Sequence, residues 1–316
     1  MKKALVIRLS SAGDILITHP LVAALKHAGY ETHLLCREKF APAAKAAGAD
    51  RVIGYSSGAG SAKSLSAEKY DALIDAQGNL RSFLLGMSVK CGVKKRCNKN
   101  PFRRRMMLLF KWFLGDKKSV SEKYVEAAAG LTGGHGAGKP SPRVNLKNKK
   151  TVDILVHDGA KWKNKRWPYV LELATELLKL RKTRVTLTGV KDEVDNSGGL
   201  LYHNSRRFKN LVGKTDFAGL LEEIRRTDIF VGNDTAAAHA AALYGKPAII
   251  FLGPTVQAFG FITGRDFIVL ENKGLMCRPC HLHGGDKCPI GSFDCMRSIS
   301  VGSALEAVKK IISRGN

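Results

Sequence analysis

Residues 3–25 read KALVIRLSSAGDILITHPLVAAL, and this stretch decides the fold class of the chain. An apolar run, residues 3–9, is followed by a small polar turn, residues 10–14, and then by a helix-length segment whose apolar residues include Leu21 and Leu25. A buried strand that enters a helix through a tight turn is the opening of a βαβ unit. The stretch therefore predicts a parallel sheet covered by helices.

The same alternation of strand and helix recurs in both halves of the chain. Further strands are expected at residues 32–36 and 72–75, and then at residues 152–157, 184–188, 229–231 and 248–252. Residues 131–142 separate the two series as a linker, because glycine runs and X-Pro steps do not continue a helix or a central strand. We predict an α/β protein of two Rossmann-like, doubly wound domains, residues 1–145 and 146–316. Its terminal helix, residues 303–313, could pack back on the first domain.

Net charge and the lengths of the apolar runs indicate which partners and which cellular compartment to expect. The sequence has 52 Lys and Arg against 27 Asp and Glu, a net charge of +25. Nucleic acid, an anionic membrane surface and phosphorylated small molecules or lipids would all be attracted to such a field. The four apolar residues before Arg8 are too few for a signal-peptide core, and no run approaches the roughly 18 apolar residues of a membrane span. The sequence therefore predicts a cytoplasmic protein.

Candidate site residues follow the strands, because ligands of doubly wound sheets bind beyond the carboxyl ends of the strands. The segments concerned are residues 10–14, 157–168, 231–239 and 252–255. In the first of them, Gly13 allows close approach to the backbone and Asp14 lies near the next helix start. Capping of that helix by Asp14 is the alternative interpretation.

The second and third segments suggest a phosphate site. The second contains the cations Lys163, Lys165 and Arg166 before a helix start, where N–H groups favour an anion. A solvated basic loop would show the same pattern. In the third segment Asp234, Thr235 and, one turn later, His239 could converge on one ligand. Simple capping by Asp234 or Thr235 remains open.

Other nucleotide-binding motifs and a catalytic metal site are not indicated. No G-x-G-x-x-G follows the first strand and no G-x-x-x-x-G-K-[ST] occurs, which disfavours hydride transfer and P-loop chemistry. Four of the seven cysteines lie close together in the sequence, at Cys277, Cys280, Cys288 and Cys295. The first pair has zinc-knuckle spacing and the second does not repeat it. We expect reduced thiols and no cofactor, with a structural zinc as the open alternative.

Taken together, these segments resemble the ADP-heptose heptosyltransferases of lipopolysaccharide core assembly, bacterial enzymes of the GT-B arrangement. The motifs that carry the resemblance are IRLSSAGDI (7–15), YDALIDAQG (70–78), KRWP (165–168), NLVGKT (210–215), GNDT (232–235) with His239, GPT (253–255) and the Cys-x2-Cys-x7-Cys-Pro pattern. Each motif alone is weak. Their order and spacing are specific and span nearly the whole chain.

The resemblance implies a function and roles for individual residues. Two domains facing across a cleft would transfer heptose from ADP-heptose to the Kdo and heptose inner core of lipopolysaccharide, with inversion and without a metal. Asp14 matches the general base and Lys165 a contact to the donor phosphates. The positions that match the nucleotide-sugar loop are Asp234, Thr235, Ala236 and His239. Ala236 departs from the glycine usual in this family, which restricts the backbone beside the pyrophosphate.

The acceptor implied by the resemblance carries phosphates and acidic Kdo sugars at the cytoplasmic face of the inner membrane. Candidate acceptor contacts are Ser11, Gly13, Arg103, Arg104 and Arg105. The arginines lie in residues 90–118, the densest basic segment with aromatic residues. That segment could dock a headgroup or lie on the anionic membrane, which would make the protein peripheral. An ordinary helix whose apolar side packs on the first domain is the alternative.

Two other functions remain open from the sequence. A GT-B glycosyltransferase with another nucleotide sugar or acceptor would share most of these motifs. A basic nucleic-acid-binding protein is suggested by charge alone, since no recognition motif accompanies it, and we expect no specific nucleic-acid partner. The sequence does not decide the glycosylated core position or the oligomeric state.

Overall fold

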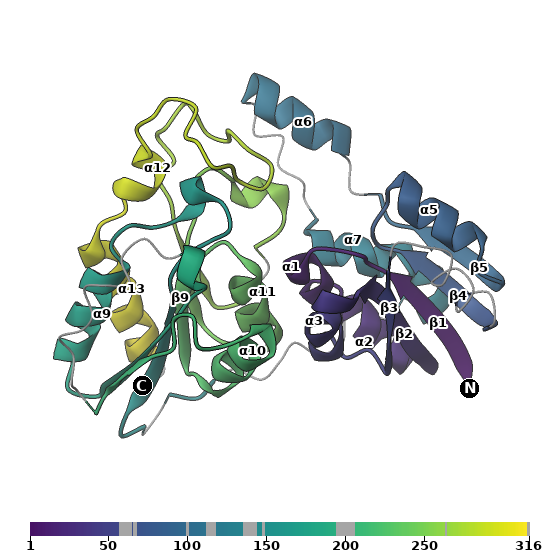
Figure 1. The fold of residues 1–316 in the computed structure, drawn as a ribbon, viewed down its shortest axis with the longest axis horizontal. Helices are drawn as coiled ribbons and strands as arrows, with labels where there is room; N and C mark the ends of the chain where they lie inside the picture. The colour runs from purple at the N-terminus through teal and green to yellow at the C-terminus, as the bar shows by residue number, and fades with distance from the viewer. Residues whose placement is uncertain are drawn as a thin grey trace. The chain divides into compact units, whose positions relative to one another are not determined.

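The computed structural model of the chain divides into two compact units, each built around one parallel sheet (Figure 1). It describes residues 1–56, 65, 68–98, 101–111, 118–134, 144–146, 149–193, 206–262 and 264–314. Unit 1 comprises Met1–Asn100 and Asp116–Pro140, and unit 2 comprises Pro101–Gly115 and Ser141–Asn316. Most of the expected linker, residues 135–142, lies outside the described residues.

Unit 1 has a five-stranded parallel sheet in the order β3-β2-β1-β4-β5. Its strands are β1 (Lys2–Ile7), β2 (Tyr30–Arg37), β3 (Arg51–Tyr55), β4 (Tyr70–Asp75) and β5 (Cys91–Arg96). Its helices are α1 (Ala12–Leu16), α2 (His19–His27), the 3-10 helix η1 (Glu38–Phe40), α3 (Ala41–Ala46), α5 (Leu80–Met87), α7 (Val120–Ala127) and α8 (Ala129–Thr132). The strand order reverses between β1 and β4, where doubly wound sheets bind their ligands.

Unit 2 has a six-stranded parallel sheet in the order β11-β10-β9-β6-β7-β8. Its strands are β6 (Val152–His157), β7 (Thr183–Thr188), β8 (Phe208–Asn210), β9 (Ile229–Asn233), β10 (Ala248–Phe251) and β11 (Phe267–Leu270). Its helices are α6 (Pro101–Phe110), η2 (Lys163–Lys165), α9 (Val170–Lys179), η3 (Lys191–Glu193), α10 (Phe217–Arg226), α11 (Ala236–Leu243), η5 (Gln257–Phe259), α12 (Asp294–Arg297) and α13 (Val301–Arg314). Here the order reverses between β6 and β9.

The central strands are apolar because helices cover both faces of each sheet. Residues 4–7 of β1 are fully buried, as are nearly all residues of β9 and β10. In unit 2 the indole of Trp167 stacks on Phe251 with ring centroids 4.0 Å apart, and its Nε1 donates to the Ile299 carbonyl over 2.9 Å. This contact anchors the loop after β6 to the core.

The terminal helix α13 packs on its own unit. Its residues Ala304, Val308 and Ile311 are buried in the core of unit 2 together with residues of α9 and β10. The apolar face of α13, which was expected as one possibility to pack on the first domain, therefore packs within unit 2.

The basic segment 90–118 is divided between the two units. Strand β5 belongs to unit 1, whereas α6 belongs to unit 2, where Met107 packs against Val256 and Phe259. Nη2 of Arg104 donates to the Phe259 carbonyl over 2.9 Å. The expected single domain boundary near residue 145 is therefore wrong, because α6 lies before that boundary and yet belongs to unit 2. Local composition shows that a helix has an apolar face but does not show which of the two cores this face packs against. Residues 112–117 of the segment lie outside the described part of the chain.

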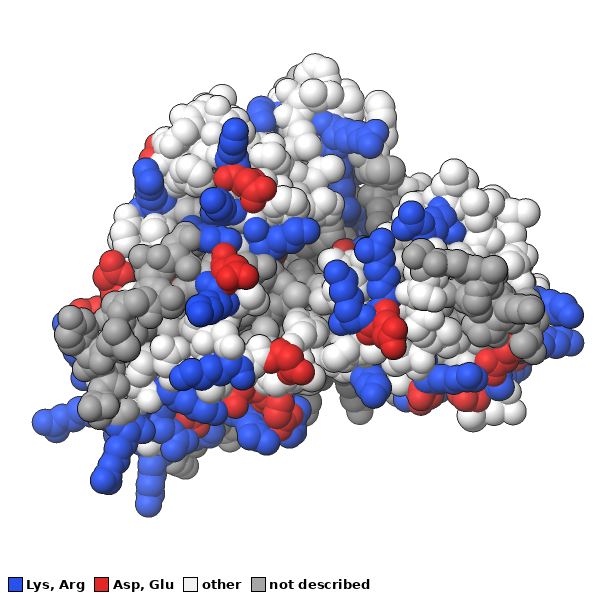
Figure 2. All heavy atoms as spheres, viewed as in Figure 1, with Lys and Arg blue, Asp and Glu red and all other residues white. Residues whose placement is uncertain are grey.

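Among the described residues, no helix combines the length and the apolar composition that a membrane span requires. The excess positive charge is widely spread. Figure 2 shows Lys and Arg side chains over the drawn face of both units, with Asp and Glu between them. Net charge alone therefore does not locate a binding site.

Candidate functional site

In unit 1 the candidate site is the turn between β1 and α1, at the reversal of strand order. Asp14 lies in the first turn of α1, and its Oδ2 accepts hydrogen bonds from the backbone N–H of Ser11 (3.2 Å) and from the Ser11 hydroxyl (2.9 Å). Asp14 therefore caps the helix as the N3 residue of a capping box, whereas the N-cap position, the alternative expected for Asp14, is occupied by Ser11. The capping box holds the carboxylate at the carboxyl end of β1, with 18% of the side chain exposed.

Arg8, at the end of β1, holds the other oxygen of that carboxylate. Its Nη2 lies 2.7 Å from Oδ1 of Asp14, and its Nη1 donates to the Ala76 carbonyl over 2.9 Å. Burial acts to lower the pKa of Arg8, but the Asp14 carboxylate outweighs it and the pKa is raised. The buried guanidinium is therefore charged and fixes Asp14 from the protein side.

The end of β4 completes this turn. The side-chain oxygen of Gln77 accepts from the backbone N–H of Leu9 over 3.1 Å. Asp75 in turn accepts from the N–H groups of Gln77 (3.0 Å) and Gly78 (2.8 Å). These bonds link the loops that follow two neighbouring strands. The roles of Arg8 and Asp75 were not predicted from the sequence, although a charged residue at the end of a buried strand is a signal that a partner is needed.

In unit 2 the candidate site is built around a buried ion pair between Lys165 and Asp234. Lys165 Nζ lies 2.6 Å from Oδ2 of Asp234, and the two side chains are 10% and 9% exposed. The Thr255 hydroxyl donates to the same oxygen over 3.0 Å. Burial acts to raise the pKa of Asp234, but the charges of Lys165 and His239 outweigh it and the pKa is lowered. Asp234 is therefore ionised and holds the Lys165 ammonium in place.

Two asparagines hold the loop that carries Lys165. Asn233, the last residue of β9, accepts from the backbone N–H of Trp167 (3.1 Å) and donates to the Gly159 carbonyl (3.0 Å). Asn164 accepts from the N–H of Gly285 over 2.9 Å. Beside it, Gly284 has φ of +106°, and a Cβ there would lie 2.8 Å from Cδ of Lys165. Only glycine fits this position, where the backbone covers the lysine stem.

The start of α11 borders this ion pair. Thr235 precedes the helix, and its Oγ1 is buried without a hydrogen-bond partner among the residues that the structure describes. The first N–H groups of a helix have no intrahelical acceptor and favour anions. Ala236 is the first helical residue, a conformation open to any L-residue. The alanine that departs from the resembled family therefore causes no backbone strain here.

The expected cations of this loop differ in their surroundings. Lys165 is buried and Lys163 is exposed, whereas Arg166 is half-buried and its Nε donates to the Ala160 carbonyl over 2.9 Å. His239 is half-buried one turn into α11. The structure thus brings Lys165, Asp234, Thr235, Ala236 and His239 together at the carboxyl edge of β9.

The arginines proposed for the acceptor do not lie in the same unit as Asp14. Ser11 and Gly13 are in its turn, Ser11 exposed and Gly13 buried. Arg103 and Arg104 are half-buried on α6 of unit 2, and Arg105 is exposed there. Since Arg104 also lies over the Phe261 ring at 4.7 Å, it serves the packing of α6.

The cysteines of the cluster form no disulfide. All seven cysteines are free thiols, and no group of three His, Cys, Asp or Glu side chains in the described ranges is arranged to hold a metal ion. Burial raises the pKa of Cys295 to about 11. This thiol is therefore protonated at neutral pH.

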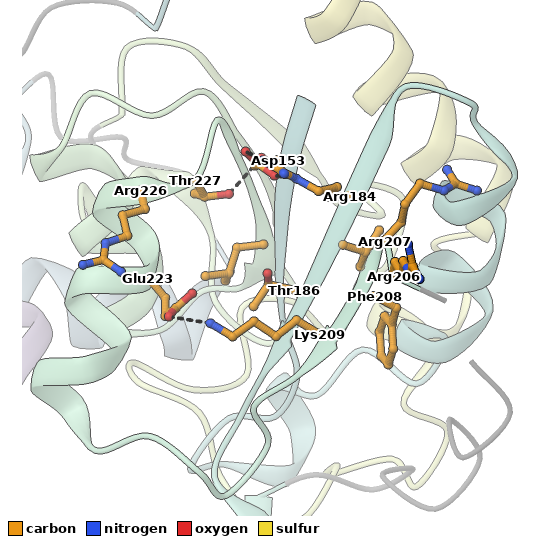
Figure 3. Close-up of a pocket in the computed structure, with 12 residues that line it drawn as sticks. Asp153, Arg184, Thr186, Arg206, Arg207, Phe208, Lys209, Glu223, Arg226 and Thr227 are labelled. Carbon is orange, nitrogen blue, oxygen red and sulfur yellow. Dashed lines mark hydrogen bonds and ion pairs between the residues drawn. The ribbon is translucent and has the colours of Figure 1, made fainter. Parts of the chain in front are cut away.

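A separate pocket of about 310 Å³ lies near the amino ends of β6, β7 and β8 (Figure 3). Basic and acidic side chains line it together. Arg184 pairs with Asp153 at 2.6 Å, and Lys209 pairs with Glu223 at 2.9 Å. The paired charges, and a location opposite the ligand edge of the sheet, make this pocket a poor match for the phosphate site.

Comparison with known proteins identifies relatives of this architecture. A model of glycosyltransferase family 9 (heptosyltransferase) matches residues 60–281. Lipooligosaccharide heptosyltransferase 2 of Campylobacter jejuni strain 81116 is 25% identical over 171 residues, covering 52% of this chain and 53% of that protein. The same enzyme of strain NCTC 11168 is 25% identical over 117 residues, covering 37% and 36%. The matched segments thus span about half or less of these curated relatives.

Solved structures match over nearly the full length. E. coli ADP-heptose LPS heptosyltransferase II is 19% identical with a TM-score of 0.73, covering 99% of both chains. E. coli heptosyltransferase WaaC with ADP is 21% identical with a TM-score of 0.66, covering 99% of this chain and 100% of that one. At such identity the likeness shows the fold, and it confirms the expected GT-B architecture of two Rossmann-like domains.

His157, the last residue of β6, makes the stability of unit 2 depend on pH. It is buried, its Nδ1 lies 3.0 Å from the Thr188 hydroxyl, and burial lowers its pKa from 6.5 to about 4. As the pH falls below 6.5, His157 becomes protonated in the unfolded chain, whereas in the folded protein it stays neutral until about pH 4. We expect the free energy of unfolding to fall by about 3 kcal/mol over this window because of His157.

Urea unfolding at neutral pH and near pH 4 checks this expectation with His157→Asn, which retains a polar atom near Nδ1. The variant should lose less stability than the original protein over the same window. Equal losses in both proteins would contradict the assignment.

Proposed function

Since this chain belongs to glycosyltransferase family 9, the heptosyltransferases, we propose that it transfers heptose from ADP-heptose to the Kdo and heptose inner core of lipopolysaccharide. The observation that carries this proposal is the buried Lys165–Asp234 pair beside the open start of α11. A cation held in place next to free helix N–H groups suits a pyrophosphate. The related WaaC has been solved with ADP and with ADP-2-deoxy-2-fluoro heptose, which supports ADP-heptose as the donor.

In unit 2 the pyrophosphate of the donor would lie against the first N–H groups of α11, within reach of Lys165. The ammonium has three N–H donors, and Asp234 occupies one of them. As the bond between the anomeric carbon and the phosphate oxygen breaks, negative charge grows on the departing ADP. Preorganised positive charge then stabilises the transition state more than the ground state. Thr235 Oγ1 offers a further polar contact to the same ligand.

In unit 1 Asp14 would act as the general base. Arg8 and Ser11 hold the carboxylate in place, and as the base it would take up the proton of the acceptor hydroxyl. That oxygen attacks the anomeric carbon from the face opposite ADP, so the configuration inverts. The proton moves to Asp14 as the new glycosidic bond forms. This scheme assigns charge stabilisation to Lys165 and the helix N-terminus and requires no metal.

The acceptor explains the positive charge of the chain. Its phosphates and Kdo carboxylates would be attracted by the +25 excess, and we assign contacts to Ser11, Gly13, Arg103 and Arg105. Arg104, whose guanidinium holds α6 on unit 2, is a weaker candidate. Because this acceptor is anchored in lipid, the enzyme would work in the cytoplasm at the surface of the inner membrane.

A donor panel tests the proposed reaction. We expect mass spectrometry to detect heptose transfer from ADP-heptose to a Kdo-bearing acceptor, with no comparable transfer from UDP- or GDP-sugars. Comparable rates with a UDP- or GDP-sugar would identify a GT-B glycosyltransferase of different donor specificity.

Asp14→Asn tests the base. The amide oxygen can still accept from Ser11, but the side chain neither takes up the proton nor balances the buried charge of Arg8. In the protein that remains folded, kcat should fall by about 10²–10⁴ with little change in the KM for the donor. Asp71→Asn, a change at an exposed carboxylate of the same unit, is the matched control. Activity of Asp14→Asn close to that of the control would remove Asp14 from the mechanism.

The double change Lys165→Met and Asp234→Asn tests the phosphate contact. It removes both charges of the pair together and so avoids leaving one buried charge alone. We expect the Kd for ADP, measured by calorimetry, to rise about tenfold or more. The exposed Lys163→Met should change it less than about threefold. The opposite ranking would move the phosphate contact to Lys163.

A further inference from the structure

Helix α5 packs on the sheet of unit 1 through its smallest side chains. Ser82 and Gly86 are its buried residues. A Cβ on Gly86 would lie 3.6 Å from Cδ2 of Leu73, and the Ser82 hydroxyl donates to Asp75 over 2.9 Å. The helix therefore lies close to the strands, and Leu85 is the large apolar residue that it packs against the core.

Four other large apolar residues of α5 face outward. Leu80, Phe83, Leu84 and Met87 are 71%, 47%, 57% and 62% exposed. Their spacing of i, i+3, i+4 and i+7 places them in one stripe along the helix. In a helix at the surface of a soluble domain this stripe normally faces the core. Contiguous apolar stripes that remain exposed mark an interaction surface.

Positive charge borders the stripe. The neighbouring edge strand β5 exposes Lys94 and Arg96 on the face of the sheet that α5 covers, and Val93 and Lys95 on the opposite face. The Arg96 guanidinium lies 5.7 Å from the Phe83 ring, although it is also 3.5 Å from Asp75. Residues 80–96 contain five Lys and Arg and no acidic residue. Figure 1 shows α5 and β5 together on unit 1, and we call their exposed face the α5–β5 surface.

We propose that the α5–β5 surface docks the protein on an anionic phospholipid bilayer. The apolar stripe would enter the boundary between headgroups and acyl chains, and the cations of β5 would contact lipid phosphates. An open pocket of about 750 Å³ beside α5, lined in part by Tyr55, Leu80 and Leu84, extends the apolar area. The inference rests on the proposed function only in that a lipid-anchored acceptor gives docking a purpose.

Helix α6 provides the matched comparison. Its side chains Phe102 and Leu109 are 74% and 73% exposed, and the helix also carries the candidate acceptor contacts at residues 103–105. Two of its side chains are used for packing, since Met107 is buried and Arg104 donates to Phe259. Docking through α5 and docking through α6 therefore predict opposite results for the same pair of variants.

Co-sedimentation of the full chain with vesicles tests the proposal. The unmodified protein should bind vesicles that contain phosphatidylglycerol more strongly than pure phosphatidylcholine vesicles. Leu80→Gln, Leu84→Gln and Met87→Gln together should reduce partitioning roughly tenfold or more. Lys94→Gln should reduce it about fivefold on the anionic vesicles only, whereas Lys95→Gln, on the opposite face of β5, should reduce it less. Phe102→Gln with Leu109→Gln should leave it unchanged.

Several results would overturn the proposal. The proposal is wrong if the unmodified protein does not bind anionic vesicles, or if the triple α5 variant binds them as well as the unmodified protein does. It is also wrong if the α6 variant loses binding. An unmodified protein that dimerises through α5, with vesicle binding unaffected by the triple variant, would show that a second copy covers this surface. Circular dichroism should show unchanged folding, because all substituted side chains are exposed.

The same variants separate docking from catalysis. The triple α5 variant should transfer heptose to a soluble, lipid-free core oligosaccharide at the rate of the unmodified protein. If neither the unmodified protein nor the triple α5 variant transfers heptose to any acceptor, the proposed function is wrong. The vesicle measurements then still test the docking surface.

Discussion

A charge buried at the end of a central strand must find an opposite charge, and this requirement shapes both candidate sites. Removing one partner of such a pair costs about 3–5 kcal/mol, because the other is left in a poorly solvated place. Arg8 therefore holds Asp14, and Lys165 is held by Asp234. The turns around them adopt the conformations that keep these partners within reach. One carboxylate and one ammonium are thereby fixed at the two reversals of strand order, the edges where such sheets bind ligands.

Much of the fold could be predicted from periodicity. The apolar run at residues 3–9 forms β1, Lys2–Ile7, and the runs of the second half form β6, β7, β9 and β10. These strands are recognisable because burial on both faces leaves little room for polar side chains. Strands β3, β5, β8 and β11 were not assigned, and the alternative of a helix in residues 90–118 was expected to pack on the first domain, whereas α6 belongs to unit 2. Met107 is apolar in the sequence, but only the fold shows that Val256 and Phe259 receive it.

The candidate site was predictable in its location more than in its contacts. The segments around Asp14, Lys165 and Asp234 were found because each follows a strand. That Lys165 pairs with Asp234, 69 positions away, is a property of the parallel sheet that brings the ends of β6 and β9 together. Arg8 shows the limit of local patterns, because its partner is Asp14 on the next turn and its second contact is the distant Ala76 carbonyl.

Because α6 belongs to unit 2 although it precedes part of unit 1 in the sequence, the two units cannot be separated by a single cut of the chain. Neither unit is one continuous stretch of chain, since residues 101–115 leave the first series of strands and complete the core of the second. A polypeptide cut near residue 145 would carry α6 away from Val256 and Phe259, leaving Met107 in water on one fragment and an unfilled apolar hollow on the other. Isolated halves of this protein should accordingly be prone to aggregation unless α6 is expressed together with the second half.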